Sequence, residues 1–173
     1  MSILVLGIGN PYMGDDGIGP RVAQRLQRDY RLPSGVAVVD GGTRGLELLS
    51  LLEGVERLLV VDAVKNGCTP GTVIRLARDQ VPRVIKAKLS MDEAGLSDLL
   101  AAAELLGHVP PEIVLWGIQP ASLDFGEELS PPVASQFDAL VLHVLEELAG
   151  WAMEGIAVLK TTGGGRRGYH DRS

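Results

Sequence analysis

The fold is decided at the start of the chain, where residues 3–19 read ILVLGIGNPYMGDDGIG. The first four of these residues are apolar without a break, which is typical of a strand that is buried on both faces. After a glycine-rich stretch, Ile18, Val22 and Leu26 recur on one helical face, with Gly19-Pro20 as a start signal. A buried strand that runs through a loop into a helix predicts the first unit of a parallel α/β sheet.

The same alternation of strand and helix continues along the chain. Short apolar runs predict further strands at residues 36–39, 58–61 and 113–115, with a fifth candidate at 72–76. Apolar residues at helical spacing predict helices at 46–52, 96–106 and 133–148, the last ending near Gly150. Strands that alternate with helices pair in parallel through right-handed crossovers. The predicted fold class is therefore α/β, a three-layer arrangement of a twisted, mostly parallel sheet flanked by helices.

Length and composition limit the possibilities further. The 173 residues suggest one α/β domain, over residues 1–151, followed by a C-terminal extension at 152–173 that we expect to be flexible from about residue 161. A net charge of -6 argues against a nucleic-acid partner, which normally meets a basic face. No stretch approaches the ~18 apolar residues that cross a membrane, and no signal peptide is recognisable. We therefore expect a cytoplasmic protein that uses neither membrane nor nucleic acid.

The glycine-rich loop after the first strand invites a dinucleotide-binding interpretation, which its other residues oppose. The fingerprint needs a third glycine where Tyr12 stands, and Pro11 removes a backbone N–H that would cradle phosphate. Asp15 and Asp16 would repel a pyrophosphate at the start of the following helix. The residues favour a carboxylate-bearing loop, although aspartate is also common as a helix cap, which is the simplest role for Asp15.

Three aspartates follow the predicted strands and are expected at one edge of the sheet. Asp16 lies in the first loop, Asp40 follows the second strand and Asp62 follows the third. Ligands of open parallel sheets bind outside the carboxyl ends of the strands, where such loops converge. Carboxylates gathered at one point repel one another, so the cluster predicts either a metal site or an acid/base pair, unless these aspartates merely cap loops.

The remaining candidates for chemistry are few. His143 is expected on the surface of the last helix, and His108 at a helix end, where the helix dipole favours a cation. Cys68, the only cysteine, lies in a turn with no histidine near it in sequence and is expected to be an incidental thiol.

Five blocks in order make the chain resemble the [NiFe]-hydrogenase maturation endopeptidases, from Ile3 to about Leu148. They are Gly7-Ile8-Gly9-Asn10 with Gly14-Asp15-Asp16-Gly17-Ile18-Gly19; Asp40-Gly41-Gly42-Thr43; Val61-Asp62-Ala63 with Pro70-Gly71-Thr72; Lys88-Leu89-Ser90 with Gly95-Leu96-Ser97-Asp98; and Gly117-Ile118-Gln119-Pro120. Each block alone is weak, but five at matching spacing are specific.

The resemblance implies an endopeptidase that removes the C-terminal extension of a [NiFe]-hydrogenase large-subunit precursor after nickel insertion. It implies no permanent cofactor, because the family is thought to contact nickel carried by the substrate. Asp16 and Asp62 match the family's metal-contacting residues and are also the expected catalytic carboxylates. The residues Asp40, Gly41, Gly42 and Thr43 are expected to line the cleft and bind substrate, since their glycines let a substrate backbone approach closely.

One residue departs from the family pattern. The third metal contact of the family is a histidine, but the sequence has Asp92 at that position. A carboxylate in place of imidazole makes the set all-oxygen, which shifts its preference away from nickel and towards harder cations. Either Asp92 is the third ligand, or Glu93 takes part, or two acids alone sense the metal. A non-catalytic module that checks the precursor for nickel is the alternative function.

Overall fold

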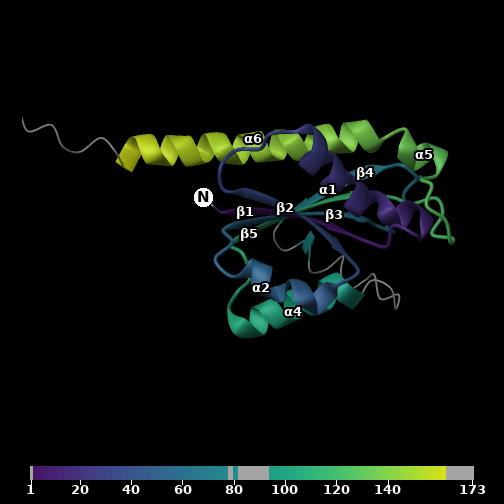
Figure 1. Ribbon diagram of the computed structural model, residues 1–173, viewed down its shortest axis with the longest axis horizontal. Coiled ribbons are helices and arrows are strands. Elements are labelled where there is room, and N and C mark those ends of the chain that lie inside the picture. Colours follow the sequence, from purple (N-terminus) through teal and green to yellow (C-terminus); the bar gives the residue numbers. More distant parts are fainter. Residues whose placement is uncertain (1, 78–79, 82–93, 163–173) are drawn as a thin grey trace, which may run out of the picture.

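The computed structural model describes residues 2–77, 80–81 and 94–162, and in these it shows one five-stranded sheet between two layers of helices (Figure 1). The strands are β1 (Ile3–Ile8), β2 (Val36–Gly42), β3 (Arg57–Ala63), β4 (Val73–Ala77) and β5 (Glu112–Ile118). The helices are α1 (Ile18–Asp29), α2 (Leu49–Leu52), α4 (Ala94–Leu106), α5 (Pro131–Ala134) and α6 (Phe137–Thr162), with single 3-10 turns η1 (Gly14–Gly17) and η2 (Gly45–Leu48).

The sheet is mostly parallel, as the sequence predicts. Its strand order is β2-β1-β3-β5-β4, and only the edge strand β4 runs antiparallel to its neighbour β5. The parallel strands are joined through helices, so their carboxyl ends lie at the same edge of the sheet. The loop that carries Asp16 and the end of β3, which carries Asp62, lie at this edge.

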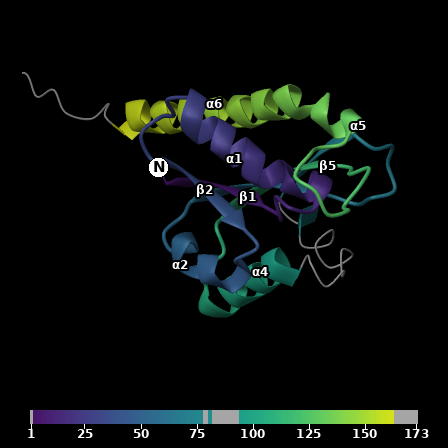
Figure 2. The ribbon, with the colours of Figure 1, turned by 45° about the vertical axis from the view of Figure 1, so that its right-hand side comes forward.

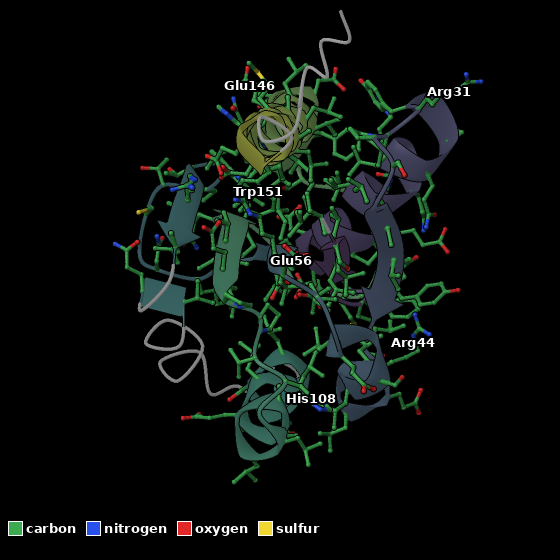
Figure 3. The ribbon with its side chains drawn as sticks, turned by 90° about the vertical axis from the view of Figure 1, so that its left-hand side faces the viewer. Arg31, Arg44, Glu56, His108, Glu146 and Trp151 are labelled. Carbon is green, nitrogen blue, oxygen red and sulfur yellow. The ribbon has the colours of Figure 1, made fainter. Side chains whose placement is uncertain are left out.

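Consecutive residues of the central strands supply two separate cores, one on each face of the sheet. Val5, Leu59 and Val61 point towards the layer of α1 and α6, and Leu4, Leu58 and Val60 point towards the layer of α2 and α4. This period of two explains why the strands are apolar throughout, because neither face meets water. Figure 3 shows the sheet almost edge-on between the two layers, with Trp151 of α6 directed towards the sheet.

Two of the predicted helices differ from expectation. The stretch predicted at 46–52 is the 3-10 turn η2 followed by the single turn α2. The last helix is preceded by α5 and does not end near Gly150 but continues to Thr162 (Figure 2). An isolated glycine weakens a helix by only about 1 kcal/mol, and Trp151, 5% exposed, holds the next turn against the sheet. Residues 163–173 lie outside the described part of the chain.

Among the described helices, none is both long enough and apolar enough to span a membrane.

Candidate functional site

The glycines of the first loop bring the helix that follows into contact with the end of β1. A Cβ on Gly7 would lie 2.2 Å from the carbonyl oxygen of Gly19, inside α1. At Gly9 a Cβ would lie 1.9 Å from the carbonyl oxygen of Asp16, and its φ of +134° disfavours other residues. These glycines therefore serve close packing of strand and helix, and they fix the backbone of Asp16 beside the end of the strand.

The Asp16 carboxylate is held by the same loop. The backbone N–H of Asn10 donates a hydrogen bond of 2.8 Å to Asp16 Oδ2. The side chain of Asn10 accepts in turn from the backbone N–H of Tyr12, at 3.0 Å, which steadies the turn. Asn10, which sequence reasoning did not single out, thus orients one of the two expected catalytic carboxylates.

Asp62 reaches the same place from the neighbouring strand. It lies near the end of β3, opposite Gly117 of β5, and it is 7% exposed. Asp16 and Asp62 line one cavity of about 40 Å³, so the predicted convergence of these two strand-end acids is confirmed. The cavity's full lining is Ile8, Gly9, Asp16, Gly42, Thr43, Gly45, Leu48, Asp62, Leu96 and Leu99.

The cavity combines two carboxylates with an apolar wall. Its volume has room for a few water molecules. Leu48, Leu96 and Leu99, from η2 and α4, exclude water on one side and thereby strengthen the field of the two acids. Within the described residues, no group of three histidine, cysteine or acidic side chains is placed to hold a metal ion. Sequence reasoning missed this wall, although helical spacing placed Leu96 and Leu99 on one buried face.

The loop after β2 contributes to the cavity only in part. Gly42 and Thr43 line it, whereas Asp40 and Gly41 do not. The Asp40 carboxylate accepts hydrogen bonds from the backbone N–H of Gly42 (3.2 Å) and from Gln24 Nε2 of α1 (3.1 Å). Asp40 thus behaves as a loop-stabilising aspartate, the simpler of the two interpretations, and the substrate-binding role of the loop stays a prediction.

The guanidinium group of Arg44 fixes the shape of this loop. It donates a 2.6 Å hydrogen bond to the carbonyl oxygen of Asp40 and a longer one to that of Gly41. Figure 3 shows Arg44 at the side of the molecule where β2 forms the sheet edge.

Asp15 is placed quite differently from its neighbour Asp16. Its side chain is fully buried and accepts hydrogen bonds from the backbone N–H groups of Ala121 (2.8 Å), Ser122 (3.0 Å) and Ser130 (2.7 Å) and from the Ser130 hydroxyl (2.8 Å). Burial acts to raise the pKa of this carboxyl, but the hydrogen bonds from Ser122, Ser130 and Ala121 outweigh it and hold the pKa below its ordinary value. Asp15 therefore does not cap the helix, one of the roles that the sequence left open for it, because its side chain joins two loops instead.

The other candidates lie away from the cavity or outside the described residues. Asp92 belongs to residues 82–93, so its role as a third metal contact stays a prediction. His143 stacks on Trp116 with ring centroids 4.7 Å apart, and His108 follows the end of α4 (Figure 3). Cys68 is exposed in the loop after β3. None of these three lines the cavity.

Known proteins similar to this chain share both its sequence and its architecture. Residues 20–147 match the family model described as hydrogenase maturation protease. The hydrogenase expression/formation protein HupD of Rhodobacter capsulatus is 43% identical over 154 residues, which are 88% of this chain and 73% of that protein. The hydrogenase 2 maturation protease of Escherichia coli is 36% identical over 159 residues, covering 90% of this chain and 96% of that protein.

Solved structures agree with these sequence matches. The hydrogenase maturating endopeptidase HybD from Escherichia coli superposes with a TM-score of 0.82 at 36% identity, over 87% of this chain and 93% of that one. The [NiFe] hydrogenase maturation protease HybD from Thermococcus kodakarensis has a TM-score of 0.67 at 30% identity, over 86% and 99% of the two chains. The predicted three-layer α/β fold is thereby confirmed.

Proposed function

Because this chain belongs to the hydrogenase maturation protease family, we propose that it is the endopeptidase that removes the C-terminal extension of a [NiFe]-hydrogenase large-subunit precursor after nickel insertion. The observation that carries the proposal is the convergence of Asp16 and Asp62 in one small cavity at the carboxyl edge of the sheet. The proposed reaction requires groups that contact a cation and groups that accept or donate protons. Two carboxylates in one cavity at the edge of the sheet can do both.

In this proposal the substrate, and not the enzyme, supplies the nickel. Asp16 and Asp62 approach the nickel held by the precursor, and Asp92 is the proposed third contact. Asp92 precedes Leu96, which lines the cavity, by four positions in sequence. Docking on the metal fixes the scissile peptide near the cavity, which removes much of the entropic part of the barrier. Gly42 and Thr43, which line the cavity, are the proposed contacts for the substrate backbone.

Hydrolysis then requires one activated water molecule. Its oxygen attacks the scissile carbonyl carbon, the carbon–nitrogen bond breaks, and the leaving amine takes up a proton. One of the two aspartates acts as the general base for that water, or the substrate's nickel polarises the carbonyl or the water as a Lewis acid. The expected location is the cytoplasm, where the precursor receives its metal.

The test compares nickel-loaded with nickel-free precursor. Each is incubated with the purified protein, and the products are weighed by intact-mass spectrometry. We expect a C-terminal fragment from the loaded precursor only, and its loss with Asp62→Asn. Glu104→Gln is the matched control, because it removes one exposed acidic charge from α4 outside the cavity. Binding without a fragment from either precursor would show that the chain is a non-catalytic nickel-checking module.

A further inference from the structure

A second and larger hollow lies on the other face of the sheet, in the layer of α1 and α6. Its volume is about 280 Å³. One wall is the polar face of α1, and the other is formed by the loop before α5, the end of α5 and the start of α6, which lie beside α1 in Figure 2. The lining residues are Arg21, Gln24, Arg25 and Arg28 on α1, and Leu129, Ala134 and Phe137 opposite. We call this hollow the arginine groove.

The arginine groove has a positive wall and an apolar wall in a protein of net charge -6. Arg25 lies over the ring of Phe137, with its guanidinium carbon 4.9 Å from the ring centroid, so one cation is held flat against the apolar wall. None of the described residues lining the groove is acidic. A protein that is acidic overall thus concentrates three arginines in one hollow.

The acidic residues near the groove neutralise it only weakly. Arg25 contacts Asp29 at 3.3 Å and Asp138 at 3.2 Å, and Arg28 contacts Asp29 at 2.7 Å. The side chains of Asp29 and Asp138 are 40% and 82% exposed. Ion pairs this exposed contribute little, but Arg28 holds Asp29 with two hydrogen bonds, of 2.7 and 3.0 Å, and must exchange both to bind another carboxylate in the same way.

Arg21 is the residue that the fold itself does not explain. It lies in the first turn of α1, half-buried, and within the described residues no hydrogen bond or ion pair involves its side chain. The positive end of the helix dipole disfavours a cation at this position. A half-buried arginine placed against the dipole is stabilised when an anion binds in the groove.

We propose that the arginine groove is a docking site for an acidic segment of the precursor. The segment is an extended peptide whose carboxylates pair with Arg21 and Arg28 and whose apolar side chain packs on Leu129 and Phe137. Guanidinium groups bind carboxylates in two-pronged geometry, which gives such a contact its selectivity. A nucleic acid is disfavoured, because it normally meets an extended basic face, whereas the groove offers three arginines beside an apolar wall.

Each wall of the groove is connected to the loop at the cavity, one along the chain and the other through hydrogen bonds. α1 begins with Ile18, two residues after Asp16, and Leu129 precedes Ser130, which binds Asp15. Both walls of the groove are therefore anchored by the loop that carries the expected catalytic carboxylate. This proposal rests on the proposed function, since it names where the precursor docks.

The experiment measures cleavage of nickel-loaded precursor by wild-type protein, Arg21→Gln, Arg21→Gln/Arg28→Gln and the control Arg31→Gln. Arg31 follows α1 at the outer corner of the molecule and does not line the groove (Figure 3). We expect KM to rise about tenfold for the double variant, with kcat unchanged and a shallower dependence on salt, because two partly exposed charge pairs with the precursor are lost. Arg31→Gln keeps the wild-type KM. A KM within twofold of wild type for the double variant overturns the proposal.

Further measurements test the docking proposal independently of the cleavage rate. The melting temperature of Arg21→Gln is expected at or slightly above that of the wild type, because the substitution removes an unfavourable charge from the start of the helix.

If the wild-type protein does not cleave, the proposed function is wrong, and the docking proposal is then tested by the Kd of labelled precursor. An unchanged Kd in the double variant, or no binding by wild type, overturns the groove. Polyglutamate must also compete better than a single-stranded oligonucleotide, and the reverse order overturns the peptide assignment.

Discussion

The loop at residues 10–17 has two sides, and they differ in almost every respect. On one side the backbone pairs with the loop before α5, through hydrogen bonds from the Gly14 N–H to the Gly126 carbonyl and from the Gly126 N–H to the Tyr12 carbonyl, both 2.8 Å. Asp15 completes that side with a fully buried carboxylate. On the other side Asp16 lines the cavity. Of two adjacent aspartates, Asp15 therefore stabilises the structure and Asp16 has the proposed catalytic role. The roles differ because the two side chains leave opposite sides of one turn and meet different surroundings.

The largest expected effect is the loss of cleavage on substitution of Asp16, on the cavity side of the loop. Asp16→Asn removes a carboxylate from the cavity while its amide oxygen still accepts the hydrogen bond from Asn10, so folding is expected to change by less than about 1 kcal/mol. Loss of a group that handles protons or contacts the metal lowers the cleavage rate about a hundredfold or more. Single-turnover cleavage of nickel-loaded precursor and a urea titration measure the two quantities. A rate within threefold of wild type would remove Asp16 from the mechanism.

The next largest effect is expected at Asp15, where substitution lowers stability more than cleavage. Asp15→Asn turns an amide NH2 group towards backbone N–H donors of Ala121, Ser122 and Ser130, so at least one buried donor loses its acceptor. We expect the free energy of unfolding to fall by about 3 kcal/mol. Cleavage per folded molecule is expected to fall far less than in Asp16→Asn. Ser130→Ala, which removes only the hydroxyl donor, is the milder companion, at about 1 kcal/mol.

The opposite ranking would contradict the division between the two sides. If Asp15→Asn leaves the urea midpoint unchanged but abolishes cleavage, the buried aspartate belongs to the chemistry, and the assignment of roles within the loop is wrong.

A third prediction concerns the backbone of the loop and compares the stability of Gly9→Ala with that of Gly54→Ala. Gly9→Ala places a methyl group against the carbonyl oxygen of Asp16 at a positive φ, whereas Gly54→Ala meets a positive φ of +75° with no atom within 4 Å. Both variants place a Cβ at a positive φ, which costs about 1 kcal/mol at the +75° of Gly54 and more at the +134° of Gly9. Only Gly9→Ala adds a clash, so we expect it to be less stable than Gly54→Ala by about 2 kcal/mol in urea titration. Equal destabilisation would show that the loop yields without cost.

The sequence predicted the sheet and its edge well because those features follow from local pattern. Continuous apolar runs indicate strands covered on both faces, and the strand-end rule brought Asp16 and Asp62 to one cavity. The antiparallel direction of β4 carried a weaker signal. Residues 64–72, between β3 and β4, contain turn-forming glycine and proline but no helix, and a parallel crossover usually needs a dozen residues or more.

What the sequence hid depends on partners that are distant along the chain. Asp15 finds its donors 106 to 115 positions away, so no local pattern separates it from a helix cap. Asp40 lies near the end of its strand, as predicted. Its carboxylate, however, accepts hydrogen bonds from Gln24 of α1 and from the N–H of Gly42. Gly150 predicted a helix end, and the burial of Trp151 overrode it. In each case a tertiary contact outweighed a local preference.

The smallest expected effect separates the two sides of the loop by pH. The pKa of Asp15 in the folded protein lies below its ordinary value of 3.8, because hydrogen bonds to the charged carboxylate outweigh the opposing effect of burial. A group whose pKa is lowered by folding stabilises the protein above its unfolded pKa, and this contribution is lost as pH falls through the folded pKa.

Wild-type protein should therefore lose its advantage over Asp15→Asn as pH falls below about 4, by about 1 kcal/mol between pH 5 and pH 3. Urea titrations of both proteins at each pH measure this difference, with Ser130→Ala as the control that keeps the carboxylate and three of its four donors. A stability difference between wild type and Asp15→Asn that is the same at pH 5 and pH 3 would mean that the hydrogen bonds of Asp15 do not favour its charge. In that event the charge of Asp15 would add nothing to the contact between the two loops, which would rest on their backbone pairing and on hydrogen bonds that do not depend on that charge.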